Sequence, residues 1–244
     1  MYANVLSCLR GECKTLLTAD EFRAILESEL KWRQEDMAFF KNQLNNLSDE
    51  AEKERYRKSL VLILYAHLEG CVKIALQTYI QYINEQNLKR NEVEIGLMVA
   101  GMHKEFLAYE NIDRKCKIFH RSLPEDKELH RHFRRVDFMN QIEDIKEQPL
   151  IIDDTIIDTE SNLWYVVLQK NLYKIGLPID LFDMYRIEID ALVNRRNSIA
   201  HGNSKSGVDA NEYQQWEGKV YNILADITRI LYDYALHKRY LANK

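Results

Sequence analysis

Apolar residues recur at three- and four-residue steps along most of the chain, which is the pattern of amphipathic helices. A first long helix is predicted over residues 20–46, with Asp20 as its cap and apolar positions at Phe22, Ile25, Leu26, Leu30, Met37, Phe40 and Leu44. A second helix is predicted from about residue 49 to 84, capped by Ser48 and acidic in its first turn. Its middle, LVLILYAHLEGCVKIAL, is apolar nearly all round, so it is predicted to be the central helix of a bundle.

The helical pattern returns in the second half of the chain. The segment TESNLWYVVLQKNLYKIGLP (159–178) predicts a helix that Ser161 caps and that Gly176 and Pro178 end. Another helix is predicted from near Asp180 into the stretch NRRNSIAHGN (194–203). The last helix is predicted from about 211 to 241, where a close three-four alternation of apolar residues runs from Tyr213 to Tyr234.

The intervening section, residues 91–148, is less regular. EVEIGLMVAGMHKEFLAY is expected to be helical despite two glycines. The two short apolar runs of PLIIDDTIID indicate a small β-hairpin insertion near residues 149–158.

Composition agrees with an all-α fold. The 244 residues include only three prolines and eight glycines, which favours long uninterrupted helices, and 46% are hydrophobic, which is enough for a proper core. No repeat and no linker composition divides the chain. One helical domain over residues 1–244 is therefore predicted, with helix 20–46 as an extension and a core of about 49–241.

The termini, the apolar runs and the cysteines predict a soluble cytoplasmic protein. The start MYANVLSCLRGECK lacks the features of a signal peptide, and the longest apolar run, Leu60 to Ala66, is far shorter than the roughly 20 residues of a membrane span. No two cysteines form a C-x-x-C pair and no His/Cys cluster has zinc spacing, so the cysteines are expected to be reduced: Cys8, Cys13, Cys71 and Cys116.

Charge is unevenly distributed, although the net charge of -4 gives no overall attraction to nucleic acid. Residues 114–135 hold eight Lys/Arg against three Asp/Glu, and residues 143–160 hold seven Asp/Glu against one lysine. On a helix, Arg131, Arg134 and Arg135 would share a face that could grip an RNA backbone. The alternative, a solvated face that balances the acidic segment, is slightly favoured by the sequence.

The end of the helix that follows Asp180 carries unusual chemistry. Its apolar face runs through Ile189 and Leu192 to Arg196, where a charge is costly unless it is paired or used. On an ideal helix His201 lies about 140° from Arg196, but Gly202 is a natural helix end, after which the imidazole could turn back toward the arginine. A titrating imidazole beside a fixed cation suits phosphodiester chemistry. An arginine–histidine pair that merely caps a helix is the commoner origin of so short a pattern.

Three segments resemble one family in the same order. RRNSIAHGN, with Arg196, Asn197 and His201, resembles the motif of the HEPN superfamily (higher eukaryotes and prokaryotes nucleotide-binding). LILYAHLEGCVKIALQTYI (62–80) and TESNLWYVVLQKNLYKIGLP resemble segments of one bacterial branch. Together the matches span about residues 60 to 202, and they imply a HEPN-like helical bundle.

The resemblance also implies a function. The expected activity is that of a metal-independent endoribonuclease without cofactors, in a toxin–antitoxin or antiviral defence system. In such proteins two protomers join their motifs in one cleft, so a homodimer with a composite site is expected, and an antitoxin or defence-system partner is a further expectation. Arg196, His201 and Asn197 are the predicted catalytic residues, and Arg195, Ser198 and Lys205 beside them are predicted to contact RNA.

Glu69 is a further catalytic candidate from the central helix. It shares a stripe with Tyr65 and Lys73, and the resemblance implies that a polar residue of this helix approaches the motif. A structural Glu69–Lys73 ion pair is an equally good reading of the sequence.

Other classes of protein receive less support. No phosphate-binding glycine loop, dinucleotide fingerprint, nucleophile elbow or zinc motif occurs in the sequence. Two alternatives to a nuclease remain. One is a non-catalytic HEPN module that binds RNA or nucleotide or dimerises, and the other is a helical adaptor or antitoxin in which the motif only caps a helix.

Overall fold

The computed structural model describes residues 16–119, 126–203 and 205–242. These residues form eight α-helices and no strand, which confirms the predicted all-α fold. The helices are α1 (Ala19–Asn42), α2 (Glu50–Asn84), α3 (Ile95–Ala100), α4 (His103–Glu110), α5 (Lys127–Lys146), α6 (Tyr165–Lys174), α7 (Arg186–Ala200) and α8 (Ala210–Leu236). Short 3₁₀ helices occur at Gln43–Asn46, Arg90–Glu92, Asp154–Ile156 and Asp183–Tyr185. The N-terminal segment with Cys8 and Cys13 lies outside the described residues, whereas Cys71 and Cys116 are buried and free.

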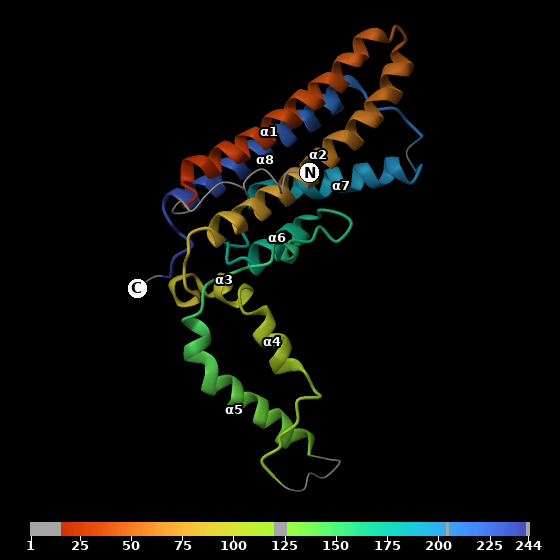
Figure 1. The fold of residues 1–244 in the computed structure, drawn as a ribbon. Helices are drawn as coiled ribbons and strands as arrows, with labels where there is room; N and C mark the ends of the chain where they lie inside the picture. Colours follow the sequence, from red (N-terminus) through yellow and green to blue (C-terminus); the bar gives the residue numbers. More distant parts are fainter. Residues whose placement is uncertain (1–15, 120–125, 204, 243–244) are drawn as a thin grey trace, which may run out of the picture.

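Helix α2 is the centre of the bundle, as predicted. Helices α1, α2 and α8 pack against one another along their length, and α7 and α6 lie across the other side of α2 (Figure 1). Because α2 is surrounded, it buries residues on most of its circumference. By length and composition alone α2 could also cross a membrane, but 56% of its most apolar window is buried inside this bundle, as in the core helix of a soluble protein.

Several helix ends differ from the predicted ones. Helix α1 is capped by Thr18 and not by Asp20: the Thr18 hydroxyl accepts from the Glu21 amide (3.2 Å), and the Glu21 carboxylate accepts from the Thr18 amide (2.8 Å). Asp20 lies inside the first turn, where it accepts from the Tyr232 hydroxyl (2.9 Å). Helix α2 begins after Asp49, so Ser48 is not its cap.

The predicted β-hairpin at residues 149–158 is wrong. The segment crosses the end of α2 and contains the 3₁₀ helix Asp154–Ile156. The Asn84 side chain pairs with both the amide and the carbonyl of Ile152 (2.9 Å each), and the Leu150 amide donates to the Leu88 carbonyl (2.8 Å). Leu150, Ile152 and Ile157 bury their side chains in the bundle core, whereas Ile151 is exposed. The backbone pairs with the end of α2 and within its own 3₁₀ turn, and not as two strands.

Helices α6 and α7 start later than predicted. Residues Glu160 and Ser161 have φ of 48° and 69°, so Ser161 cannot cap α6, which begins at Tyr165. The Tyr165 amide donates instead to Asp190 on α7 (2.8 Å). The residues after Asp180 form a turn and the 3₁₀ helix Asp183–Tyr185 before α7 begins at Arg186. The predicted helix end at Gly176 is confirmed, since its φ is 70°.

Helices α4 and α5 form an arm that projects from the bundle (Figure 1). We define the arm as residues 103–146. The rings of Phe106 and Phe138 stack at 5.7 Å and join the two helices. At the base of the arm, Arg90 pairs with Glu105 (2.8 Å) and donates to the Ile145 carbonyl (3.3 Å).

A buried polar cluster joins α1 to α2 on the side of α2 that faces away from α7. His67 contacts Asp36 through Nε2 (3.0 Å) and the Arg33 guanidinium through Nδ1 (3.4 Å), and Arg33 pairs with Glu29 (2.5 Å). Burial and, next, the charge of Arg33 lower the pKa of His67. His67 is therefore an element of the α1–α2 contact.

Candidate active site at the end of α7

The motif lies where α7 ends, and the helix end has a defined geometry. Gly202 has φ of 72°, its amide donates to the Ile199 carbonyl (3.1 Å), and the Asn203 amide donates to the Ser198 carbonyl (2.9 Å). This pair of bonds around a left-handed glycine is the Schellman motif. The helix thus ends at Ala200, as the position of Gly202 predicted, with His201 as its last cap residue.

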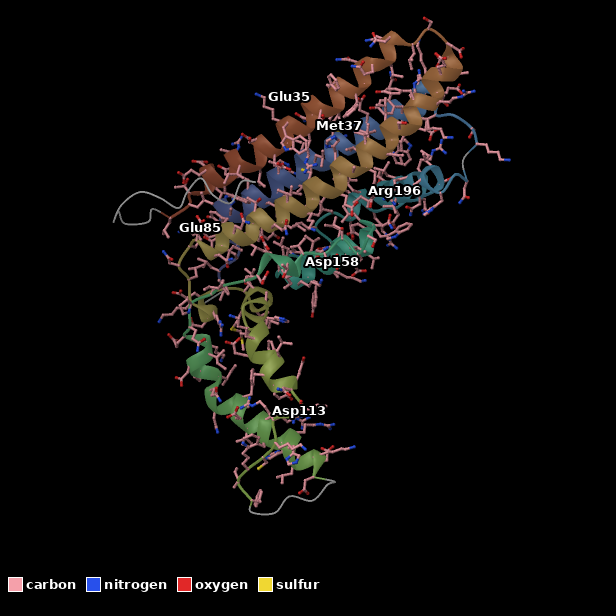
Figure 2. The ribbon with its side chains drawn as sticks, turned by 45° about the vertical axis from the view of Figure 1, so that its right-hand side comes forward. Glu35, Met37, Glu85, Asp113, Asp158 and Arg196 are labelled. Atoms are coloured by element: carbon pink, nitrogen blue, oxygen red, sulfur yellow. The ribbon has the colours of Figure 1, made fainter. Side chains whose placement is uncertain are left out.

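Arg196 is half-buried and held from three sides, inside the bundle in Figure 2. Its Nη1 donates to the side-chain oxygens of Asn162 (3.1 Å) and Asn197 (2.8 Å). Its guanidinium carbon lies 5.0 Å from the centre of the Tyr65 ring on α2. Among the described residues no carboxylate forms an ion pair with Arg196, so its charge is held in place by neutral groups.

Tyr65 links the motif to Glu69. Its hydroxyl accepts from the buried Leu163 amide (2.8 Å). The pKa of Tyr65 is raised to about 12, mainly by burial and partly by the charge and hydrogen bond of Glu69, whereas the Leu163 amide and Arg196 act to lower it. Glu69 thus lies beside the motif, one phenol away from Arg196. No ion pair joins Glu69 to Lys73 in the described structure.

Asn162 is a site residue that the sequence did not single out. It lies in the loop before α6, which contains the two positive-φ residues Glu160 and Ser161. The loop is fixed by Asn171, whose side chain pairs with the Asp158 amide (3.0 Å) and carbonyl (2.7 Å). Non-glycine residues with positive φ cost free energy and concentrate at functional sites. In the sequence, Asn162 appears only as an asparagine shortly before a predicted helix, in TESNLW. Asparagine there is typical of a helix cap, so the sequence alone does not indicate a site residue.

The structure separates His201 from Arg196. Arg196 faces α2, whereas the His201 ring is exposed and forms no hydrogen bond or ion pair with Arg196 in the part of the chain that is described. The expected return of the imidazole toward the arginine is therefore not seen within one chain. His201 remains a solvent-accessible imidazole at the C-terminal end of α7.

The three residues predicted to contact RNA beside the motif differ in their surroundings. Arg195 pairs with both carboxylate oxygens of Glu212 (2.7 and 3.2 Å), which joins α7 to the start of α8. Ser198 is half-buried, and its carbonyl is used in the helix end. Lys205 is exposed on the loop between α7 and α8.

The second predicted RNA-binding group lies on α5 in the arm. Figure 2 shows Asp113, near the far end of this arm, well away from Arg196. Arg131 pairs in solvent with Glu128 (3.1 Å), and Arg135 is exposed. Arg134 is buried and donates to the Arg114 carbonyl (3.2 Å), so it does not share the exposed face predicted for the three arginines.

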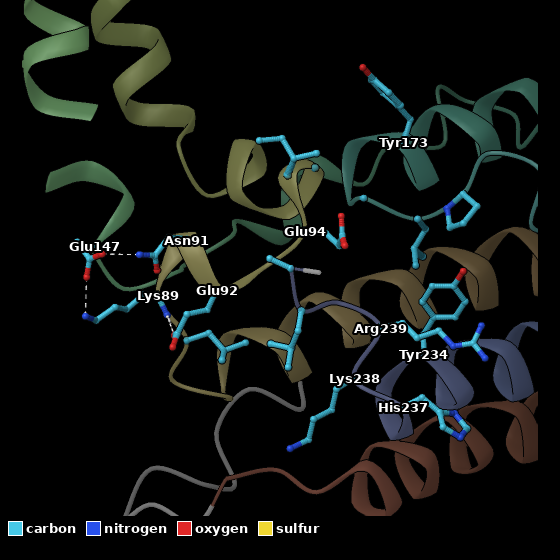
Figure 3. A pocket seen from close by; sticks show the side chains of 18 residues that line it. Lys89, Asn91, Glu92, Glu94, Glu147, Tyr173, Tyr234, His237, Lys238 and Arg239 are labelled. Atoms are coloured by element: carbon cyan, nitrogen blue, oxygen red, sulfur yellow. Dashed lines mark hydrogen bonds and ion pairs between the residues drawn. The ribbon is translucent and has the colours of Figure 1, made fainter. Parts of the chain in front are cut away.

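The cavities of the bundle lie elsewhere. One of about 1340 Å³ opens at the base of the arm between the 3₁₀ helix Arg90–Glu92 and the end of α8 (Figure 3), and a smaller one of about 610 Å³ lies between α3, α4 and the end of α6. Neither is lined by Arg196, Asn197 or His201. No three His, Cys, Asp or Glu side chains of the described residues converge as a metal site would require.

A long-helix bundle with an arginine–histidine motif at the end of α7 is the architecture of a HEPN-type helical domain. The family model for HEPN_MAE_28990-like HEPN matches residues 22–240, and the chain therefore belongs to the HEPN superfamily. This match includes α1 and most of the described residues. Neither the curated proteins nor the solved structures contain a match to the chain.

Proposed function

We propose that this protein is a metal-independent endoribonuclease whose active site is completed by a second copy of the chain. The observation that carries the proposal is the Arg196 guanidinium, which Asn162, Asn197 and Tyr65 hold without a paired carboxylate. A fixed, unneutralised arginine is suited to bind a phosphate and the charge that develops on it. Superfamily membership supports a ribonuclease or a nucleotide-binding module, and the motif favours the former.

In the proposed reaction the 2′-hydroxyl of the RNA attacks the adjacent phosphorus. His201 accepts the 2′-hydroxyl proton or donates a proton to the departing 5′-oxygen, and the P–O5′ bond breaks to leave a cyclic phosphate and a free 5′-hydroxyl. Arg196 binds the non-bridging phosphate oxygens. Asn197 and Asn162 position Arg196, and Glu69 acts through Tyr65.

A second chain is proposed because Arg196 and His201 face different sides of α7. On the outer side, His201 continues a stripe with Ile187 and Asn194 at seven-residue steps. Ile187 is 79% exposed and the nearby Met184 is 59% exposed, so two large apolar side chains lie uncovered beside this stripe. A symmetric dimer along this stripe would join the two α7 ends, so that Arg196 of one chain and His201 of the other can share one phosphate.

The resemblance extends the proposal to a toxin–antitoxin or antiviral defence system with a neutralising or activating partner protein. The alternative is a non-catalytic HEPN module, and the separation of Arg196 from His201 within one chain favours it if the protein proves monomeric.

The test is incubation of the purified protein with total RNA and transfer RNA in EDTA. We expect cleavage that leaves cyclic-phosphate ends, reduced about 100-fold or more in Arg196→Ala and in His201→Ala. Arg186→Ala and His103→Ala, which change an exposed arginine and an exposed histidine outside the motif, are the matched controls. Equal cleavage by all variants would place the activity elsewhere. No cleavage, with RNA binding unaffected by the motif changes, would favour the non-catalytic module.

A further inference from the structure

The arm presents cations that no described residue neutralises. Residues 114–117 have no helical structure and contact the first half of α5. Two contacts fix this segment: the Arg114 carbonyl accepts from Arg134, and the Cys116 amide donates to His130 Nδ1 (3.1 Å). Cys116 is buried, whereas Lys115 and Lys117 on either side of it in the chain lie on the solvent side of this segment. Both are exposed and have no partner among the described residues.

Helix α5 adds a second row of cations beside this segment. Arg131 and Arg135 are one turn apart and exposed, in contrast to the buried Arg134 between them. Arg131 forms an ion pair with Glu128, three residues earlier, and both side chains are exposed. Such an exposed pair contributes little to stability, so a phosphate can replace Glu128 as the partner of Arg131. Arg135 has no partner in the described structure.

Large apolar side chains accompany these cations. Ile118 is 72% exposed and Phe119 is 58% exposed, directly after Lys117 in the chain. The described part of the arm packs on the bundle at its base, and no other helix of the described chain covers these two side chains. An exposed aromatic ring beside unpaired cations is the arrangement by which proteins bind single-stranded nucleic acid, with a base stacked on the ring and phosphates on the cations.

Within the arm, residues 114–135 form a basic stretch of an acidic protein. Residues 114–135 carry eight Lys/Arg and three Asp/Glu, although the whole chain has a net charge of -4. Near the motif, Arg195 is neutralised by Glu212 and Arg196 is held by its asparagines. Beyond Lys205, the site has few free cations of its own to hold the flanks of a long RNA.

We propose that the outer end of the arm is an RNA-docking site, formed by Lys115, Lys117, Phe119, Arg131 and Arg135. It binds the backbone and one unstacked base of a single-stranded or looped region, at a distance from the Arg196 site. The arm thereby selects long or structured RNA over short oligonucleotides. This inference rests on the proposed function for its substrate, but the binding itself does not require cleavage.

The first test measures RNA binding in a His201→Ala background, where cleavage cannot obscure it. Fluorescence anisotropy with labelled transfer RNA compares Lys115→Gln/Lys117→Gln, Phe119→Ala and the control Lys31→Gln/Arg55→Gln, whose exposed cations lie on α1 and α2. We expect the arm pair to lower the slope of log affinity against log salt by about 0.7 for each lost phosphate contact. Phe119→Ala should weaken binding about 10-fold. The control should match the background protein.

The second test uses the catalytically intact protein and compares cleavage of transfer RNA with cleavage of a short oligonucleotide. The arm variants should lower the ratio of long- to short-substrate cleavage about 10-fold, by loss of stacking and phosphate contacts. Unchanged affinity in the arm variants overturns the inference, as does binding to vesicles of acidic phospholipid in place of RNA. If the wild-type protein fails to cleave RNA but the arm variants lose binding, the nuclease proposal fails and the docking site stands.

Discussion

At the scale of single residues, Arg196 replaces an apolar side chain on the packing face of α7. Its charge is accommodated because the neighbouring Tyr65 offers a ring face and the two asparagines offer oxygens, all of them neutral groups. This arrangement depends on Tyr65 being anchored. The anchor is the Leu163 amide, which is buried and donates to the Tyr65 hydroxyl.

Removal of that hydroxyl tests the anchor. In Tyr65→Phe the Leu163 amide loses its acceptor in a buried place, so the free energy of unfolding should fall by about 1–3 kcal/mol. Urea denaturation measures the change. Tyr173→Phe, which alters a tyrosine that is 74% exposed, is the control and should be neutral. Equal stability of the two variants would mean that water can replace the phenol.

The motif residues could be predicted from sequence, but Asn162, which also holds Arg196, could not. Arg196, Asn197 and His201 lie within six residues and resemble a known pattern. Asn162 reaches Arg196 only because Glu160 and Ser161 adopt positive φ and because Asn171 fixes the loop. Neither residue before Asn162 is a glycine, so nothing local in the sequence indicates this turn.

At the scale of elements, the helices follow from apolar periodicity, but their ends depend on tertiary contacts. Asp190 of α7 accepts from the first amide of α6, a role that no sequence pattern within α6 reveals. Leu150 and Ile152 look like strand residues in isolation, yet they pack against the bundle beside α2. The contact of α3 with the end of α6 is equally invisible, since it requires two glycines 80 residues apart.

The close approach of Gly96 and Gly176 predicts how an added methyl group changes stability, and Gly218 provides the control. A Cβ added at Gly96 would lie 2.5 Å from the Gly176 Cα, so Gly96→Ala must separate α3 from α6 and should cost about 1–3 kcal/mol. Gly218 lies in α8 with no atom within 4 Å of an added Cβ, so Gly218→Ala should gain about 0.5–1 kcal/mol. Thermal unfolding should therefore shift in opposite directions. A stabilising Gly96→Ala would show that the two helices have room to move apart.

At the scale of the whole molecule, the motif at the end of α7 in the bundle and the basic stretch of the arm lie in different parts of the chain. The proposed active site needs a second copy, and the exposed apolar side chains beside the motif offer a surface for it. From the sequence, a dimer is expected only because of the resemblance to the family. The exposed apolar surface that favours it can be recognised only in the folded chain.

The dimer is tested by Ile187→Asp. A carboxylate in the centre of an apolar interface should weaken association by about 10-fold or more, with cleavage lost in parallel. Sedimentation at several protein concentrations measures the association. Ile118→Asp changes an isoleucine of similar exposure on the arm, and should leave the oligomeric state unchanged.

Mixing provides an independent check on the shared site. Arg196→Ala and His201→Ala proteins, each inactive alone, should regain part of the activity when they form mixed dimers, because one intact arginine then meets one intact histidine. A monomeric wild-type protein that cleaves RNA, or mixtures that stay inactive although mixed dimers form, would contradict a site built from two chains.

The position of α8 in the bundle has a consequence for the nascent chain. Helix α2 packs against α8, which follows it by more than a hundred residues. Lys41 of α1 also forms an ion pair with Glu217 of α8 (2.6 Å), which cannot form before α8 is made. Until α8 leaves the ribosome, α2 is a 35-residue helix with an uncovered apolar surface, of a kind that could pass for a membrane span. Newly made chains should therefore depend on chaperones that shield α2, and they reach the active fold only after α8 has been made.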